Sequence, residues 1–401
     1  MKIHSEVTFL YILMCQSAFI QLENKLKMAL KQQTKSKVIN FPGSISSHIN
    51  SSKVPPSAEL YAALDLGTNS CRMLIAQPNG NQFHVVDSFS KTVQLGAGLE
   101  STGRLSKISM ARTIGALMIC QRKLRHHSVT RMRLIATEAC RRASNATEFI
   151  NLIERETGLQ LEIIPAEEEA RLAVISCAPL VSINTKQLLV VDIGGGSTEL
   201  VWIDLSEVPK VDRRKAIMKL HLGFDSNQDD FPKAKVVDWI SVPLGVATLK
   251  EQFNDVTDDS AKFALMSWFF EEKLAKFSPY KDGIQIKDGF QVVGTSGTVT
   301  TVAASHLGLD RYDRGKVDGL RMTSHQIENV IQSYLALGPE GRRKDPRIGK
   351  DRHVLIMSGA AILQALMRIW PTDRMSVADR GLREGLLYAQ MSQDGVLEEG
   401  A

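Results

Sequence analysis

Residues 188–202 read Leu-Leu-Val-Val-Asp-Ile-Gly-Gly-Gly-Ser-Thr-Glu-Leu-Val-Trp. The apolar run at the start predicts a buried strand, and the apolar run after Glu199 predicts a second one. Three consecutive glycines between them remove three Cβ atoms, which lets backbone N–H groups turn toward a ligand. Such a loop suits an anion, and the carboxylates of Asp192 and Glu199 suit a cation such as Mg²⁺ between them and a phosphate. The alternative is a plain hairpin with a glycine turn.

The same layout occurs earlier in the chain, in residues 61–76. Asp65 there corresponds to Asp192, which lies 127 residues later (192 minus 65), and the glycine and serine that follow correspond in the same way. A third glycine loop, residues 294–298, follows another strand-like run at 291–293. The repeat indicates two related α/β domains with phosphate in the cleft between them, the usual place for a ligand site.

These motifs resemble the exopolyphosphatase / guanosine pentaphosphate phosphatase (Ppx/GppA) family of the sugar kinase–actin–Hsp70 superfamily. The resemblance runs from about Tyr61 to about Met391 and is carried by six segments in the family's order: residues 65–70, 136–142, 165–171, 192–199, 294–298 and 381–385. It implies an α/β fold with two actin-like (ribonuclease H-like) domains and an interdomain phosphate-binding cleft. The chain resembles the short form, without the C-terminal helical domain of long members.

The resemblance also implies an order of domains along the chain. We expect an N-terminal extension in residues 1–57, actin-like domain I in 58–167 and actin-like domain II in 168–384. Residues 385–401 are expected to form a C-terminal helix that returns to domain I.

Hydrolysis of a phosphoanhydride requires neutralisation of charge on the phosphoryl group, an in-line water and a group that accepts its proton. The resemblance points to Glu169 as that base, in the first turns of a predicted helix; the alternative is that it only complements the helix N-terminus. The resemblance also points to Asp192, Glu199 and Asp65 as residues that bind Mg²⁺. For these the alternatives are carboxylates at strand ends or on exposed strand positions.

Arginine suits bidentate contact with phosphate. Arg72 and Arg141 match arginines that line the phosphate site of the family, although Arg72 alternates with apolar strand residues and would also fit an outward position. Arg352 matches a third, but the family's acidic residue two positions on is here Val354, so its role stays open. The full set of expected phosphate-binding residues is Gly67, Thr68, Asn69, Ser70, Arg72, Arg141, Gly194, Gly195, Gly196, Ser197, Thr198, Gly294, Ser296, Gly297 and Thr298.

Composition limits the other classes of function. The 401 residues include five scattered cysteines with no C-x-x-C pair, which favours reduced thiols and a cytoplasmic protein. Residues 1–57 hold seven lysines and two glutamates, so the remainder, with 42 basic and 42 acidic residues (49 minus 7 and 44 minus 2), has no net charge. We therefore expect no nucleic-acid partner. The apolar segment 7–22 is too short and interrupted for a membrane span, and we expect no membrane partner; a homodimer is compatible with the sequence.

Three further expectations concern local structure. Ser106 should cap a helix whose buried face contains Ile108, Ala111, Ile114 and Met118, with Leu117 and Leu124 as further candidates. The polar residues 204–235 should form a surface insertion. Residues 340–352 should form a basic loop next to the cleft.

The sequence therefore predicts a Mg²⁺-dependent phosphohydrolase. It would release terminal orthophosphate from inorganic polyphosphate, the 5′-γ-phosphate of guanosine pentaphosphate, or both, and guanosine tetraphosphate belongs to the same class of ligand. Short polyphosphate should be used at least as well as long chains, because only the cleft and the basic loop can hold a polyanion. The alternatives are an ATP-dependent kinase of the same superfamily and a non-catalytic alarmone-binding protein.

Overall fold

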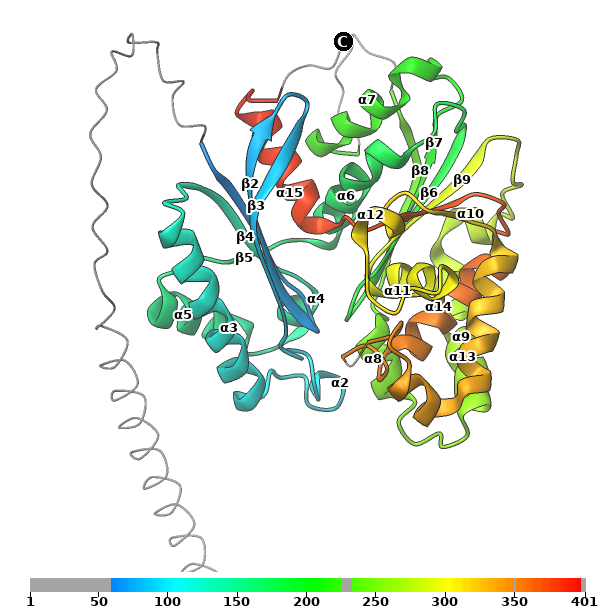
Figure 1. Ribbon diagram of the computed structural model, residues 1–401, viewed down its shortest axis with the longest axis horizontal. Coiled ribbons are helices and arrows are strands. Elements are labelled where there is room, and N and C mark those ends of the chain that lie inside the picture. The colour runs from blue at the N-terminus through cyan, green and yellow to red at the C-terminus, as the bar shows by residue number, and fades with distance from the viewer. Residues whose placement is uncertain (1–58, 225–232, 350, 398–401) are drawn as a thin grey trace, which may run out of the picture. The chain divides into compact units, whose positions relative to one another are not determined.

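The computed structural model describes residues 59–224, 233–349 and 351–397. These residues belong to one compact unit that begins at Pro56 and contains two β-sheets, seen at the left and right of Figure 1. The predicted N-terminal extension, residues 1–57, lies outside the described residues. The other predicted domain boundaries stay predictions.

The two sheets repeat one topology. The first has the order β3(Gln82–Thr92), β2(Ser70–Asn79), β1(Tyr61–Leu66), β4(Arg131–Ala136), β5(Glu162–Ile163). The second has the order β8(Lys235–Val242), β7(Thr198–Asp204), β6(Gln187–Ile193), β9(Phe290–Thr295), β11(Met375–Ala378), β10(Arg321–Met322). In each, the first three strands are antiparallel and the next two run parallel to the third. The predicted repeat of strand, glycine loop and strand is therefore two β-hairpins at matching places in two sheets.

The repeat extends to an irregularity in the hydrogen-bond ladders. The register of β2 on β3 shifts between Ile75 and Ala76, and that of β7 on β8 shifts between Trp202 and Ile203. These positions are also 127 residues apart (202 minus 75). A β-bulge bends its strand and increases the local twist, so both sheets curve at the same point.

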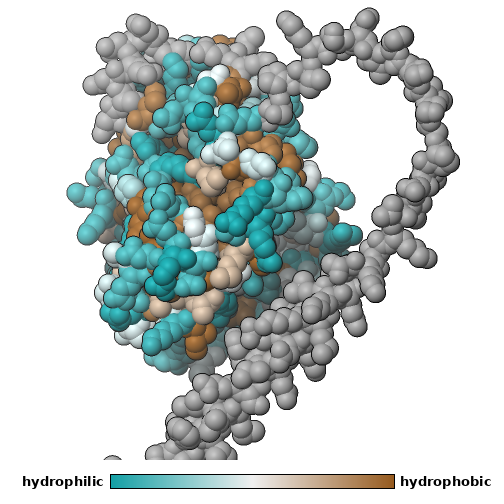
Figure 2. Space-filling view, turned by 90° about the vertical axis from the view of Figure 1, so that its left-hand side faces the viewer, coloured by the Kyte–Doolittle hydropathy of each residue, from teal (hydrophilic) through white to brown (hydrophobic). Residues whose placement is uncertain are grey.

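Helices α2(Leu99–Thr102), α3(Lys107–His126), α4(Glu138–Arg142) and α5(Ala146–Thr157) accompany the first sheet. As predicted, Ser106 caps α3, because its side chain accepts a hydrogen bond from the Ser109 N–H at 3.1 Å. The predicted buried face is correct at Leu117 and Leu124, which are buried, and at Ile114, which packs against the same core. It is wrong at Ile108, Ala111 and Met118, which are exposed, while Ser109 and Thr113 are buried instead. Their hydroxyls donate to the carbonyls of Gln94 and Ser109, which removes the penalty for burying them. Figure 2 views the side that carries α3 and α5, where hydrophobic residues lie among hydrophilic ones.

Two helices, α6(Ala166–Cys177) and α15(Leu382–Gln393), lie between the sheets (Figure 1). One face of α6 packs with β1 and α15 through Leu172 and Ile175, and another packs with β6 and β7 through Val174. A Cβ atom at Gly385 of α15 would lie 2.1 Å from the Leu172 carbonyl oxygen. Glycine at 385 is therefore required for the close approach of the two central helices.

The second sheet is covered by helices around one large core. They are α8(Val246–Gln252), α9(Asp259–Glu272), α10(Ser278–Lys281), α11(Gly297–His306), α12(Arg314–Val317), α13(Ser324–Lys344) and α14(Ile356–Ile369). Helix α7(Arg213–Met218) packs with α6 in a separate cluster. Trp202 stacks on Phe290 with ring centroids 5.3 Å apart, and Trp370 lies 5.7 Å from Trp202. Gly338, with φ 62°, kinks α13 just before Pro339.

Two expectations about this half are corrected. Residues 204–224 are anchored to the core rather than forming a surface insertion, because Leu205, Val208 and Ile217 pack with α6 and the sheet, and the Arg213 side chain donates to two backbone carbonyls. Residues 225–232 of the predicted insertion lie outside the described residues. The predicted basic loop begins as the last turn of α13, which ends at Lys344. Three of its arginines already have acidic partners: Arg342 pairs with Asp259 at 2.7 Å, Arg343 with Glu340 at 2.9 Å and Arg347 with Asp345 at 2.6 Å.

Candidate active site

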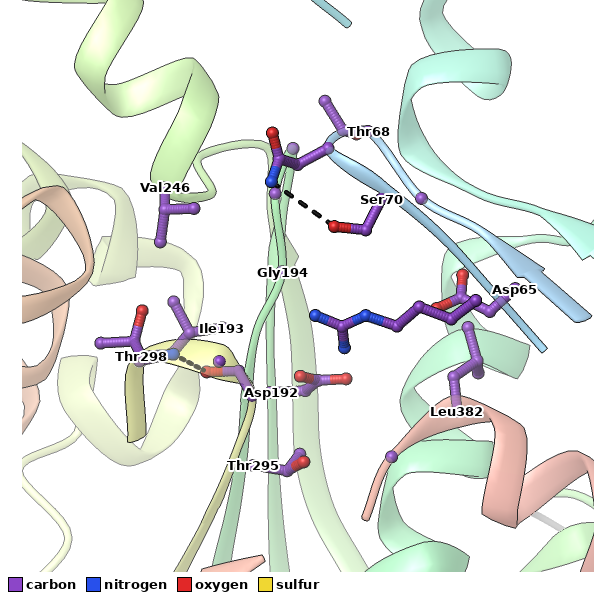
Figure 3. Close-up of a pocket in the computed structure, with 18 of the residues that line it drawn as sticks. Asp65, Thr68, Ser70, Asp192, Ile193, Gly194, Val246, Thr295, Thr298 and Leu382 are labelled. Carbon is purple, nitrogen blue, oxygen red and sulfur yellow. Dashed lines mark hydrogen bonds between the residues drawn. The ribbon is translucent and has the colours of Figure 1, made fainter. Parts of the chain in front are cut away.

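Four segments meet at a cleft of about 440 Å³: the β1–β2 loop, the β6–β7 loop, the β9–α11 junction and the β11–α15 junction. Figure 3 shows Asp65 and Asp192 entering the cleft from the first and second sheet, with Thr298 on one side and Leu382 at the start of α15 on the other. The expected site residues that line it are Asp65, Gly67, Thr68, Asn69, Ser70, Arg72, Glu169, Asp192, Gly194, Gly195, Gly196, Ser197, Ser296, Gly297 and Thr298.

The two hairpin loops touch across the cleft. A Cβ atom at Gly195 would lie 3.0 Å from the Asn69 nitrogen, and one at Gly196 would lie 2.3 Å from the Thr68 hydroxyl oxygen. None of the three glycines of the β6–β7 loop has a positive φ. Gly195 and Gly196 therefore serve the close approach of the β1–β2 loop. Gly194 serves the tight turn that the sequence suggested, because its Cβ atom would lie 2.9 Å from the Ser197 carbonyl oxygen.

The third glycine segment is a strand end followed at once by a helix, rather than a loop. Strand β9 ends at Thr295 and α11 begins at Gly297, so only Ser296 lies between them. The Ser296 hydroxyl accepts from the Thr298 and Val299 N–H groups at 3.2 and 3.5 Å. Its φ of 131° lies in a region that residues with a side chain rarely adopt. The α11 N-terminus thus faces the cleft with its amides and its dipole.

Burial and crowding of carboxylates make the cleft electrostatically unusual. Desolvation, together with the charges of Glu169 and Asp65, raises the pKa of Asp192 to about 7, against the effect of Arg72. Desolvation and Asp192 likewise raise the pKa of Glu199 to about 7. Desolvation raises the pKa of Asp65 as well, while Arg72 opposes this. Negative charge in this cleft is under-compensated by the protein itself, so the site favours an added cation.

Glu169 lies in the first turn of α6 and is 8% exposed. Arg141 Nη1 lies 2.7 Å from Glu169 Oε2, and Arg141 also donates to Glu138 and to the Ile164 carbonyl. Desolvation and the nearby Glu199 hold the pKa of Glu169 well above its ordinary value, although Arg141 lowers it. A carboxylate with a raised pKa suits proton abstraction near neutral pH.

Four expected site residues do not line the cleft. Arg141 is behind Glu169 and orients that carboxylate instead of facing a ligand. Thr198 is buried and donates to the Leu244 carbonyl at 2.8 Å, while Gly294 makes room for Val299. Glu199 is 2% exposed and accepts from Ser241 Oγ at 2.8 Å, so it acts from behind Asp192.

Sequence reasoning missed the contribution of the β11–α15 junction, residues 378–383, all of which line the cleft. Its motif was noticed only as part of the resemblance, because nothing in the local pattern says that α15 starts beside Asp65. Thr137, Glu138 and Arg352 line the cleft too. Arg352 Nη1 donates to the Gly297 carbonyl at 3.1 Å, which places its charge at the start of α11.

In the part of the chain that the structure describes, no group of three or more His, Cys, Asp or Glu side chains is arranged to hold a metal ion. This fits Mg²⁺, which proteins commonly bind through one or two carboxylates together with water and substrate phosphates. The raised pKa of Asp192 is the second observation consistent with a cation beside it. No helix in the described ranges is long and apolar enough to cross a membrane.

The model of the Ppx/GppA phosphatase family matches residues 74–394. The chain belongs to this family. This Ppx/GppA protein is 29% identical over 338 residues to the guanosine-5'-triphosphate,3'-diphosphate pyrophosphatase of Aeromonas salmonicida, and the match covers 84% of this chain and 60% of that protein. This chain thus spans less than two thirds of the length of that curated relative.

Solved structures of Ppx/GppA proteins match over nearly their whole length. The Ppx/GppA enzyme of Aquifex aeolicus is 30% identical with a TM-score of 0.63, covering 82% of this chain and 99% of that one. An exopolyphosphatase from Cytophaga hutchinsonii is 21% identical with a TM-score of 0.69, covering 86% and 100%, a likeness that shows the fold alone. The predicted fold class, α/β with two actin-like domains, is confirmed.

Proposed function

We propose that this Ppx/GppA protein is a Mg²⁺-dependent phosphohydrolase that removes a terminal phosphate from a phosphoanhydride. Its substrate would be inorganic polyphosphate, guanosine pentaphosphate or both. The single observation that carries the proposal is the position of Glu169, a buried carboxylate with a raised pKa in a cleft lined by two glycine loops and a helix N-terminus. The relative named for a guanosine pyrophosphatase supports guanosine pentaphosphate as a substrate, and a solved exopolyphosphatase-like protein that is 26% identical supports polyphosphate.

The residues of the chain divide the chemistry between them. Backbone N–H groups of the hairpin loops and of the α11 N-terminus would bind phosphate oxygens, assisted by Arg72 and Arg352. Glu169 would accept a proton from the attacking water, and Arg141 would keep its carboxylate oriented. Burial of these groups strengthens each electrostatic interaction with the phosphoryl group that is transferred.

Asp192 is the residue best placed to hold Mg²⁺, with Asp65 facing it across the cleft and Glu199 adding negative charge from behind. When bound, the ion would neutralise charge that develops on the phosphate oxygens. Oxygen donors alone are available here, which favours Mg²⁺ over softer metals.

The charges near the cleft bear on the length of polyphosphate that it can bind. Arg342, Arg343 and Arg347 of the predicted basic loop are engaged in ion pairs, whereas Arg352 lines the cleft. A long polyanion therefore has few cationic contacts beyond the cleft, and we expect short chains to be used at least as well as long ones.

The four cysteines in the described ranges are buried and free, which supports a cytoplasmic location.

One assay tests the proposal. Orthophosphate release is measured from tripolyphosphate and from guanosine pentaphosphate, side by side, with Mg²⁺ and with a chelator in excess. We expect release from at least one substrate with Mg²⁺ and none with chelator. Release only after addition of an acceptor would instead indicate the kinase alternative, and tight binding of guanosine pentaphosphate without release would indicate the binding protein.

A further inference from the structure

The start of α15 brings a second arginine to the cleft that Arg72 lines. Arg383 is the second residue of this helix and lines the cleft, as Arg72 does. Both side chains are half-buried. No hydrogen bond or ion pair found in the described residues includes either guanidinium group.

The neighbouring cations are not free in this way. Arg380 pairs with Asp318 at 2.9 Å, and Arg314 contacts the Asp379 carbonyl and Glu384. Glu384 in turn accepts from the Gly381 N–H at 2.9 Å. The acidic groups around this junction are therefore already engaged by Arg380, Arg314 and the helix cap, and Asp65 is the carboxylate that faces Arg383.

Asp65 attracts both arginines, but the free protein also carries unfavourable terms at this place. Arg72 and Arg383 are close enough to repel one another, and Asp65 and Asp192 attract Arg72 only in part. A cation in the first turn of a helix also opposes the helix dipole. Two unfavourable terms at one place indicate a residue that is retained for a ligand rather than for stability.

We infer that Arg72 and Arg383 together form an anion subsite that binds one phosphate group of the substrate. Two forked guanidinium groups that line one cleft can each donate two hydrogen bonds to the oxygens of one phosphate. Bound phosphate would also remove the repulsion between them. This inference rests on the proposed function for the identity of the substrate, but the subsite itself is defined by an inorganic phosphate chain.

The test uses binding rather than turnover. Sodium tripolyphosphate is titrated into the full-length protein at constant ionic strength, and its dissociation constant is obtained from the shift of the melting temperature. R383Q should raise this constant about tenfold or more. R122Q, which removes an exposed arginine from α3, is the matched control and should bind as the wild type does.

The melting temperatures of the variants without anion give a second test. Loss of a purely structural arginine would lower the melting temperature, whereas loss of an arginine kept for a ligand would not. Without anion, R383Q should melt at the wild-type temperature or about 1–2 °C higher, because the repulsion and the dipole penalty are gone. R383K keeps the charge and loses the fork, so its affinity should be about threefold or more below that of the wild type. Wild-type affinity in R383Q, or in R383K if R383Q does not fold, would overturn the inference.

Failure of the subsite and failure of the proposed function give different results. A wild type that binds tripolyphosphate and loses affinity in R383Q, yet releases no orthophosphate, retains the subsite and loses the phosphohydrolase proposal. If the wild type releases orthophosphate from either substrate and R383Q binds tripolyphosphate as the wild type does, the phosphohydrolase proposal stands and the subsite is ruled out.

Discussion

The two hairpins β1–β2 and β6–β7 are the same structure with one decisive difference. In the first, Asp65 pairs with Arg72 across the strands; in the second, Asp192 pairs with Glu199 at the same register. Cross-strand partners point to one face of the sheet. The duplicated fold therefore presents the cleft with a wall of mixed charge on one side and a purely acidic wall on the other.

This difference allows one cleft to bind both a cation and a phosphate group. The acidic wall repels phosphate unless a cation intervenes, and the wall with Arg72 attracts phosphate directly. Glu169 lies near the acidic wall and takes its raised pKa partly from Glu199. Two acidic hairpins would lack the arginine at position 72 that can contact phosphate. Two hairpins with arginine at this position would lack the pair of carboxylates, Asp192 and Glu199, that favours a cation.

The largest expected effect comes from removing the base at the acidic wall. Glu169→Gln keeps the size of the side chain and should lower kcat by roughly 10²-fold or more, the typical loss for a general base. Steady-state phosphate release measures it, and Glu167→Gln, in the same helical turn but outside the cleft lining, is the control. A near-normal rate in Glu169→Gln would remove this residue from the mechanism.

A pair of substitutions tests the two walls against each other. Asp192→Ala should raise the Mg²⁺ concentration for half-maximal activity by about tenfold or more. Arg72→Gln should instead raise KM by about tenfold and leave the Mg²⁺ dependence unchanged. Titrations of metal and of substrate on both variants separate these outcomes. Wild-type Mg²⁺ dependence in Asp192→Ala would place the metal elsewhere.

Glu199→Ala should also raise the Mg²⁺ requirement, but by less than Asp192→Ala, because Glu199 acts from behind the cleft lining. The same metal titration measures it. An effect as large as that of Asp192→Ala would show that Glu199 reaches the ion directly.

The pH profile tests how Glu169 is tuned. Glu169 must be ionised to accept a proton, so activity falls as the pH drops through its pKa, which is raised above the ordinary value of 4.5. Arg141 stabilises the ionised form, and Arg141→Met should therefore move the acidic limb of kcat/KM upward by about 1 pH unit. Arg142→Met, whose side chain pairs with Glu100, should leave the limb in place. A limb that does not move in Arg141→Met would separate Arg141 from the base.

The smallest effect concerns the strained residue at α11. Ser296→Gly should stabilise the fold by about 1 kcal/mol, because glycine tolerates φ 131° and is nearly as good a helix cap as serine. Ser296→Ala keeps the strain and loses the cap, so it should destabilise. Denaturant unfolding measures both changes, and equal effects from Gly and Ala would exclude strain as the cause.

Short-range patterns account for what the sequence determined by itself. The repeat of Asp65 at Asp192, the strands on either side of each loop and the cap at Ser106 all follow from neighbouring residues. Such signals depend on local backbone preference and hydrophobic alternation. They predict two related α/β units with glycine loops at a cleft. The resemblance to a family supplied the actin-like fold, the role of Glu169 and the roles of the metal-binding and arginine residues.

Tertiary structure decided the features that depend on distant partners. In the structure Arg141 pairs with Glu169, Arg342 pairs with Asp259, and Arg383 lines the same cleft as Arg72, across sequence separations that no local pattern reports. The buried face of α3 also depended on carbonyls that accept its serine and threonine hydroxyls. The charge of a side chain can be read from the sequence, but its partner is set by which segments the fold brings together.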